Sequence, residues 1–188
     1  TLSAVGKREV VAAVGEGRTV DNESPLSLTL AQGVARGEKM DLIVQQATEL
    51  GIARIVPILT ARSEAKLDAA RPEKRLQHWR AVAASACEQS GRARVPVIEP
   101  TVSLAAWLGS LGDDGPMRLA LLPEGTKRPG ELALTDAAIL AIGPEGGFGE
   151  RDRAALAASG FTGLKLGPRI LRTETAGLAA IAAPQGLH

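Results

Sequence analysis

The chain has 188 residues, of which 45% are hydrophobic and 23% charged, so it can bury one core with room for a small second unit. This composition excludes a disordered polypeptide, and no apolar run approaches the roughly 18 residues that cross a bilayer. No basic leader followed by an apolar segment opens the chain. We therefore expect a cytoplasmic protein that has no membrane partner.

Cysteine and histidine are too scarce to indicate a metal site. Cys87 is the single cysteine, which excludes an intramolecular disulfide, and the two histidines, His78 and His188, lie far apart in sequence. Tyrosine is absent and four other aromatic residues are present, which argues against a sheet that stacks RNA bases. The expected chemistry uses no metal, or it uses an organic cofactor.

Basic charge is concentrated in the middle of the chain, although the net charge is only +1. Residues 62–94 carry eight basic and four acidic side chains, whereas residues 95–160 carry five and nine. Such asymmetry is typical of a surface that meets phosphate. The alternative is the solvated face of a single helix that carries Arg71, Lys74, Arg75 and Arg80.

Two short apolar runs at the beginning, residues 8–14 and 26–32, are separated by turn-forming Gly, Asp and Asn. We interpret them as remnant strands of a small β-domain that occupies residues 1–34. A short linker near residues 35–39 then leads into an α/β domain over residues 35–188.

From residue 40 onward, helical and strand patterns alternate. Glycines at positions 51, 91 and 160 are predicted to end helices, and Pro72 to begin one. This alternation predicts a parallel α/β sheet with helices on both faces. The expected strands are 52–59, 95–99, 118–124, 137–143 and 161–167, and the expected helices are 40–50, 72–90, a short one after Ser103, one from about 150 to 160, and 173–183.

Ligands of parallel sheets bind beyond the carboxyl ends of strands, and residues 142–149 (IGPEGGFG) leave such an end. The glycines of this segment expose backbone groups to a ligand. Neither register fits the dinucleotide fingerprint and no P-loop is present, while an inward Glu145 would repel phosphate and suit a sulfonium cation. The alternative is a tight turn with Gly149 capping the next helix.

A second loop, residues 166–176 (LGPRILRTETA), follows the last expected strand. Ile170 and Leu171 form an apolar pair inside it, which indicates a pocket that can hold an adenine. The alternative is that Thr173 caps the last helix while Arg172 and Glu174 form a surface pair. That helix is nearly all Ala and Gly, so it can approach a second subunit closely.

Five segments in register resemble the ribosomal RNA small-subunit methyltransferase E family over about residues 31–183. They are residues 39–51 (KMDLIVQQATELG), 61–66 (ARSEAK), 86–92 (ACEQSGR), 142–148 (IGPEGGF) and 166–176. The resemblance implies a SPOUT fold with a C-terminal trefoil knot, a homodimer, and S-adenosylmethionine as cofactor. It also implies an N-terminal PUA-like RNA-binding barrel, of which residues 1–34 are the last strands, and methylation at N3 of a uridine in 16S ribosomal RNA of the small subunit.

The family's sites are carried over onto matching positions. Cofactor contacts are expected from Leu122, Gly143, Pro144, Glu145, Gly146, Gly147, Leu166, Gly167, Ile170, Leu171 and Thr175, and RNA contacts from Arg62, Gln89 and Arg92. For the chemistry we expect Arg172 to stabilise negative charge on the uracil carbonyls. Glu174 is expected to orient Arg172 or to help remove the N3 proton, and water is the alternative base because no histidine stands in these motifs.

Three rival functions remain open at this point. One is a non-catalytic ribosome-assembly factor that binds RNA without S-adenosylmethionine. Another is a nucleotide-binding oxidoreductase, which ranks lower because its glycine fingerprint is missing. The third is a SPOUT methyltransferase that acts on a different RNA.

Overall fold

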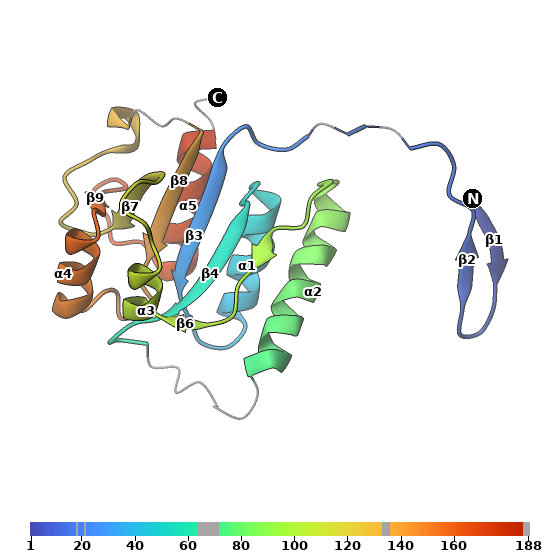
Figure 1. Ribbon diagram of the computed structural model, residues 1–188, viewed down its shortest axis with the longest axis horizontal. Helices are drawn as coiled ribbons and strands as arrows, with labels where there is room; N and C mark the ends of the chain where they lie inside the picture. The colour runs from blue at the N-terminus through green and yellow to red at the C-terminus, as the bar shows by residue number, and fades with distance from the viewer. Residues whose placement is uncertain (18, 21, 64–71, 133–135, 186–188) are drawn as a thin grey trace.

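The computed structural model describes residues 1–17, 19–20, 22–63, 72–132 and 136–185. Its centre is a seven-stranded sheet in which every strand pair is parallel (Figure 1). The strand order is β5-β4-β3-β8-β7-β9, and β6 pairs with β4. The strands are β3 (Ser27–Gly33), β4 (Arg54–Leu59), β5 (Val97–Ile98), β6 (Val102–Ser103), β7 (Met117–Leu121), β8 (Ala137–Ile142) and β9 (Thr162–Leu164).

Helices cover both faces of this sheet, as the alternating pattern predicts. One face packs against α1 (Lys39–Glu49), α2 (Pro72–Ser90) and α5 (Thr173–Gln185), and the other against α3 (Leu104–Gly109) and α4 (Glu150–Ala158) (Figure 1). The first core contains Ile43, Trp79 and Ile181, and the second contains Trp107 and Leu156. The predicted α/β class is therefore confirmed, and the element bounds agree with the predicted ones to within a few residues.

The strand at Ser27–Gly33 is present, but the domain that we assigned to it is wrong. It pairs in parallel with both β4 and β8, so it is an inner strand of the α/β sheet. Leu28 and Leu30 are buried in one core while Ala31 is buried in the other. A strand that is buried on both faces has a continuous apolar sequence. Because Ser27–Gly33 precedes the expected linker, the sequence did not indicate that this strand belongs to the α/β sheet.

The segment before β3 contains a separate antiparallel hairpin. Its strands are β1 (Leu2–Val5) and β2 (Val10–Ala12), and all residues of both are exposed. Figure 1 shows the hairpin apart from the sheet. A β-unit distinct from the α/β sheet is thus confined to the residues before β3.

The strand order determines where a site can form. The strand β8 lies between β3 and β7, and β9 lies beyond β7. Because the strands are parallel, the carboxyl ends of β7, β8 and β9 are neighbours at the same end of the sheet. The chain leaving β9 must then return past these ends, since α5 packs against α1, β3 and β8. Among the described residues, none of the helices is both long and apolar enough to cross a membrane.

Candidate active site

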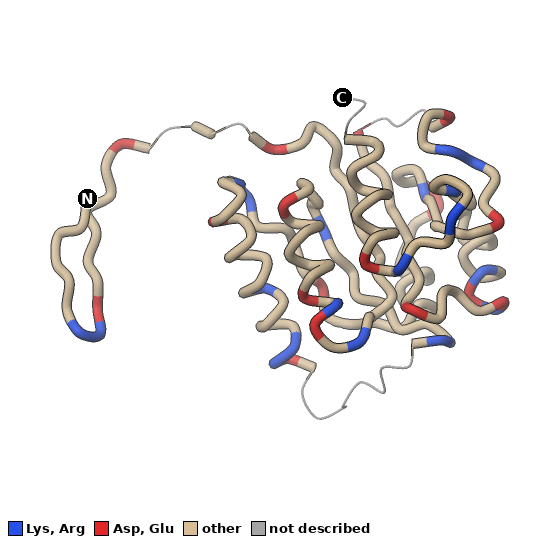
Figure 2. Tube along the Cα trace, turned by 180° about the vertical axis from the view of Figure 1, so that it is seen from behind, with Lys and Arg blue, Asp and Glu red and all other residues tan. Residues whose placement is uncertain are grey.

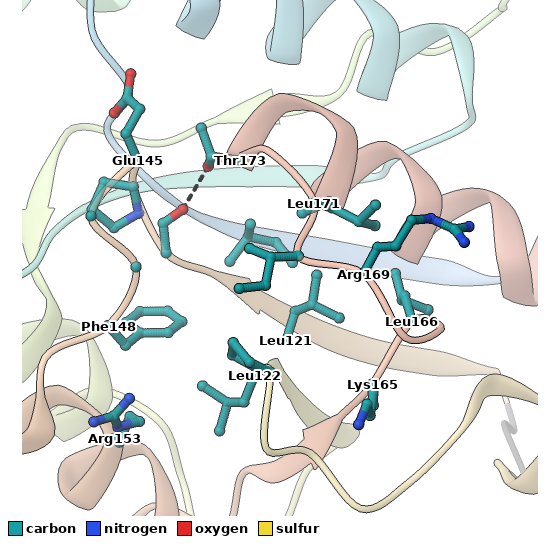
Figure 3. Close-up of a pocket in the computed structure, with 18 of the residues that line it drawn as sticks. Leu121, Leu122, Glu145, Phe148, Arg153, Lys165, Leu166, Arg169, Leu171 and Thr173 are labelled. Atoms are coloured by element: carbon teal, nitrogen blue, oxygen red, sulfur yellow. Dashed lines mark hydrogen bonds between the residues drawn. The ribbon is translucent and has the colours of Figure 1, made fainter.

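A cavity of about 320 Å³ opens where the chain leaves β7, β8 and β9 (Figure 3). Its walls are the end of β7, the glycine loop at residues 143–148 and the return segment at residues 165–171. The volume is at the lower end of the range for small-molecule sites. The lining residues are Arg62, Leu121, Leu122, Pro123, Ile142, Gly143, Pro144, Glu145, Gly146, Gly147, Phe148, Arg153, Lys165, Leu166, Gly167, Pro168, Arg169, Ile170, Leu171, Thr173 and Ala176.

The glycine loop is folded back tightly on itself and on β3. A Cβ atom on Gly143 would lie 2.8 Å from the carbonyl carbon of Gly147, and one on Gly33 would lie 2.4 Å from the nitrogen of Pro144. The N–H of Gly147 donates to the carbonyl of Pro144 at 2.7 Å, and Gly147 has a φ of +66°, which favours glycine. Any larger residue at Gly33 or Gly143 would push the loop away from the cavity.

Hydrogen bonds from three elements hold the loop in place. The hydroxyl of Thr173, at the start of α5, donates to the carbonyl of Gly143 at 2.6 Å (dashed in Figure 3). The guanidinium of Arg62 donates to the carbonyl of Gly146 at 3.0 Å. The carboxylate of Asp152 accepts the N–H groups of Gly149 and Ala61, which ties the loop end to the segment after β4.

A buried amide lies behind this loop. Gln32, at the end of β3, is fully buried, and its Nε2 donates to the Thr173 hydroxyl and to the Gly33 carbonyl, both at 2.9 Å. Its Oε1 has no hydrogen-bond partner among the described residues. The chain Gln32–Thr173–Gly143 therefore couples β3, α5 and the cavity wall.

Glu145 lines the cavity but does not point a free carboxylate into it. Its Oε1 accepts the N–H of Arg36 at 3.1 Å and the Lys39 ammonium at 3.3 Å, and Figure 3 shows its carboxylate turned away from the cavity centre. Burial alone would raise the pKa of Glu145, but these bonds and one from its own N–H together hold it below its usual value. The carboxylate of Glu145 thus pairs with Lys39 of α1 and does not point into the cavity, as we had expected it to.

The apolar pair in the return segment lies where the sequence placed it. Ile170 is 86% exposed, and Leu171 is half-buried against the core. Both line the cavity together with Leu122 and Leu166. An isoleucine so exposed beside an apolar wall offers surface that a flat, apolar ligand group can cover.

Ten of the eleven predicted cofactor residues line the cavity, and Thr175 does not. Thr175 is exposed and lies two residues beyond the buried Thr173, on another face of α5. Arg172 and Glu174 also lie outside the lining. Arg172 is exposed, whereas Glu174 is half-buried and its Oε2 has no hydrogen-bond partner among the described residues.

The three predicted RNA residues lie in different environments. Arg62 is exposed on the cavity wall, so it belongs to the same site as the glycine loop. The Arg92 side chain is only 7% exposed and binds Glu23 and the carbonyls of Thr48 and Ile52, at the amino edge of the sheet. The guanidinium of Arg92 is therefore engaged inside the protein, which argues against the RNA contact expected of it. Gln89 is exposed near that same distant edge.

Sequence reasoning missed several residues of the site. Gln32 was read as part of a β-domain, and Thr173 only as a helix cap. A signal existed for Asp152, since an acidic residue three positions after Gly149 is typical of a helix start. Lys165, Arg169 and Arg153 add positive charge around the cavity (Figure 3), and Arg153 pairs with Glu124 at 3.3 Å. In the described ranges, no group of three His, Cys, Asp or Glu could hold a metal ion.

Comparisons with known proteins place this arrangement in a family. The family model for the RNA methyltransferase domain matches residues 22–185. Ribosomal RNA small subunit methyltransferase E of Bacillus subtilis is 33% identical over 192 residues, which cover 97% of this chain and 74% of that protein. The protein of the same name from Mycobacterium bovis is 35% identical over 161 residues, covering 83% of this chain and 62% of that protein.

A solved structure agrees with these relatives. The crystal structure of ribosomal RNA small subunit methyltransferase E from Neisseria gonorrhoeae bound to S-adenosylmethionine has a TM-score of 0.89 and 37% identity, and it covers 99% of this chain and 76% of that one. The chain thus spans between 62% and 76% of these three proteins. It belongs to the RNA methyltransferase domain family and, within it, to the ribosomal RNA small subunit methyltransferase E family.

Proposed function

We propose that the chain methylates N3 of a uridine in 16S ribosomal RNA of the small subunit, with S-adenosylmethionine as the methyl donor. The observation that carries this proposal is the cavity at the ends of β7, β8 and β9, because ten residues expected to contact the cofactor line it. The Neisseria relative, which covers 99% of this chain, was crystallised with S-adenosylmethionine. The names of the relatives support ribosomal RNA of the small subunit as the substrate.

The residues present fit S-adenosylmethionine. Leu122, Leu166, Ile170 and Leu171 offer an apolar wall for an adenine, and the loop at residues 143–147 offers main-chain groups with little side-chain obstruction. When bound, the cofactor supplies an electrophilic methyl group on a sulfonium. The tight loop packing then holds the cofactor's position, which is how enforced proximity lowers a barrier.

Arg172 and Glu174 are proposed to act on the RNA base rather than on the cofactor. Arg172 is exposed next to the cavity residue Leu171 and outside the lining, which suits a group that meets a base arriving from solvent. Its guanidinium would stabilise negative charge that develops on the uracil carbonyls. Glu174, with a carboxylate oxygen that lacks a partner among the described residues, would orient Arg172 or accept the N3 proton.

We further propose a trefoil knot of the SPOUT kind at the carboxyl end. The return segment after β9 lies between the segment after β7 and the glycine loop, because the N–H of Lys165 donates to the carbonyl of Lys127 at 2.8 Å while residues 165–171 share the cavity with residues 143–148. Such a segment, followed by α5 against β3, is compatible with threading. The hairpin β1–β2 is proposed to be the remnant of a PUA-like RNA-binding barrel, as the family resemblance implies.

A homodimer that works in the cytoplasm completes the proposal. Figure 2 shows α5 without charged residues beyond its first turn. The part of α5 that is not fully buried carries Leu178, Ala179, Ala182 and Ala183. Small apolar residues allow another backbone to approach closely, so this face is the one we propose against a second copy.

The test is methyl transfer from labelled S-adenosylmethionine to small ribosomal subunits from cells that lack this protein, followed by mapping of the modified nucleotide. We expect 3-methyluridine at one site in 16S RNA. Label in transfer RNA instead would support the alternative of another RNA substrate. Tight RNA binding without any binding of S-adenosylmethionine in isothermal titration would support the non-catalytic assembly factor.

A further inference from the structure

A second cavity of about 350 Å³ lies beside the first and is lined by Arg128, Pro129, Lys165, Gly167 and Pro168. Lys165, Gly167 and Pro168 also line the first cavity, so this short stretch forms a wall between the two. Two of the five lining residues are cations and none is acidic. Nothing in the expected cofactor site uses Arg128.

The backbone brings these two cations together. Lys127 and Leu164 form a parallel bridge, and the N–H of Lys165 donates to the carbonyl of Lys127 at 2.8 Å. The segment after β7 and the segment after β9 are thereby fixed side by side. Arg128 and Lys165 project from this pair of segments, and both are exposed.

No carboxylate of the described chain neutralises either cation. The ion pairs at the carboxyl edge are Lys39–Glu145 and Arg153–Glu124, and neither Arg128 nor Lys165 enters one. Glu131 is close in sequence, but its Oε2 accepts the backbone N–H of Arg128 at 3.0 Å and so serves the short helix η1 (Pro129–Glu131). Two cations on paired backbone segments without a counter-charge favour an anionic ligand.

We infer that this second cavity binds a backbone phosphate of the RNA strand whose target nucleotide approaches the mouth of the first cavity. The inference rests on the proposed function, because it takes RNA as the molecule that approaches the cofactor cavity. A guanidinium and an ammonium suit a phosphate, the guanidinium by bidentate hydrogen bonds and the ammonium as a point charge. Contacts of this kind set the register of a strand and carry no base information.

The test compares Arg128→Gln with Lys127→Gln in the full chain. Lys127 is the adjacent exposed cation and lines neither cavity, so it is a matched control for loss of one charge. Binding of a 16S RNA fragment is measured by fluorescence anisotropy at several salt concentrations. For Arg128→Gln we expect the Kd to rise about fivefold and the slope of log Kd on log salt to fall by about 0.7 to 0.9, the effect of one lost phosphate contact.

Arg128→Lys should recover most of the affinity, because it keeps the charge. The inference is overturned if Arg128→Gln binds RNA with the affinity and salt slope of the wild type, or if Lys127→Gln loses as much as Arg128→Gln. A different result would refute the proposed function alone. If the wild-type protein transfers no methyl group, but Arg128→Gln still weakens RNA binding, the methylation is refuted and the phosphate site is supported.

Discussion

The buried side chain of Gln32 donates to the hydroxyl of Thr173 across 141 positions of sequence, and that hydroxyl donates onward to the Gly143 carbonyl. The three residues come from β3, from the start of α5 and from the glycine loop. The amide is fully buried, so water cannot replace the bonds if one member is lost. This chain of hydrogen bonds thus links the position of α5 to the shape of the cofactor cavity.

Thr173→Val should weaken S-adenosylmethionine binding as well as destabilise the fold. The change leaves the Gly143 carbonyl and one Gln32 N–H without partners, each at a typical cost of about 1 to 3 kcal/mol. We expect the dissociation constant from isothermal titration to rise about tenfold. Thr175→Val is the control, since Thr175 is exposed and outside the cavity. Equal losses in both variants would show that the buried hydroxyl has no special role.

The class of fold and most of the cavity could be predicted because they depend on local patterns. Apolar strands that alternate with helices predict a parallel sheet, and glycine-rich strand ends predict where a ligand meets backbone. The place of Ser27–Gly33 could not be predicted in this way, because strand order depends on pairings such as β3 with β8, more than 100 residues away. Periodicity identified a strand but not its neighbours.

Roles of polar side chains were harder to predict, for a related reason. Arg92 lies in a motif that suggested RNA, yet its partners, Glu23, Thr48 and Ile52, come from two other parts of the chain. Gln32 appeared in a strand without any sign that its amide meets Thr173. A residue's type indicates what it can bind, whereas the fold determines which partner lies within hydrogen-bond distance.

Arg92→Met should destabilise the protein without a specific loss of RNA affinity. Removing the guanidinium leaves the Glu23 carboxylate, 17% exposed, with the backbone N–H of Arg94 but without its charged partner. Because Glu23 is only part-buried, we expect a loss of about 1 to 3 kcal/mol. We expect urea unfolding to show this loss for Arg92→Met, whereas Arg94→Met, an exposed neighbour, should change stability by less than about 0.5 kcal/mol. Intact stability together with weaker RNA binding would restore the RNA role for Arg92.

The ion pair of Arg92 and Glu23 predicts that the stability of the fold depends on pH. The hydrogen bond from Arg92 lowers the pKa of Glu23 despite some burial, with help from the charge of Arg92 and backbone N–H groups. A lowered folded pKa means that the stabilisation is complete above the ordinary glutamate pKa of about 4.3 and is lost as pH falls through the folded value. Glu23→Gln should therefore be less stable than wild type at pH 7, and the gap should narrow below about pH 4. Urea titrations between pH 3 and 7 measure this gap, and a constant gap would contradict the assignment.

Arg172→Ala should lower turnover far more than cofactor affinity. The side chain is exposed beside the cavity but not within its lining, so cofactor binding does not need it. Loss of one preorganised charge at a developing anion typically costs about 10²- to 10³-fold in rate. Single-turnover methyl transfer and isothermal titration separate the two effects. Equal losses in rate and affinity would instead make Arg172 a cofactor-pocket residue.

Gly33→Ala tests whether β3 sets the position of the glycine loop. The added methyl would lie 2.4 Å from the nitrogen and 2.5 Å from Cδ of Pro144, so Pro144 and the loop after it must move. Overpacking of this kind typically costs about 1 to 3 kcal/mol, and the displaced loop should also lower S-adenosylmethionine affinity. Gly109→Ala is the matched control because a Cβ there meets nothing within 4 Å. If Gly33→Ala and Gly109→Ala had the same unfolding temperature and the same S-adenosylmethionine affinity, the contact between β3 and the loop would not determine the shape of the cavity.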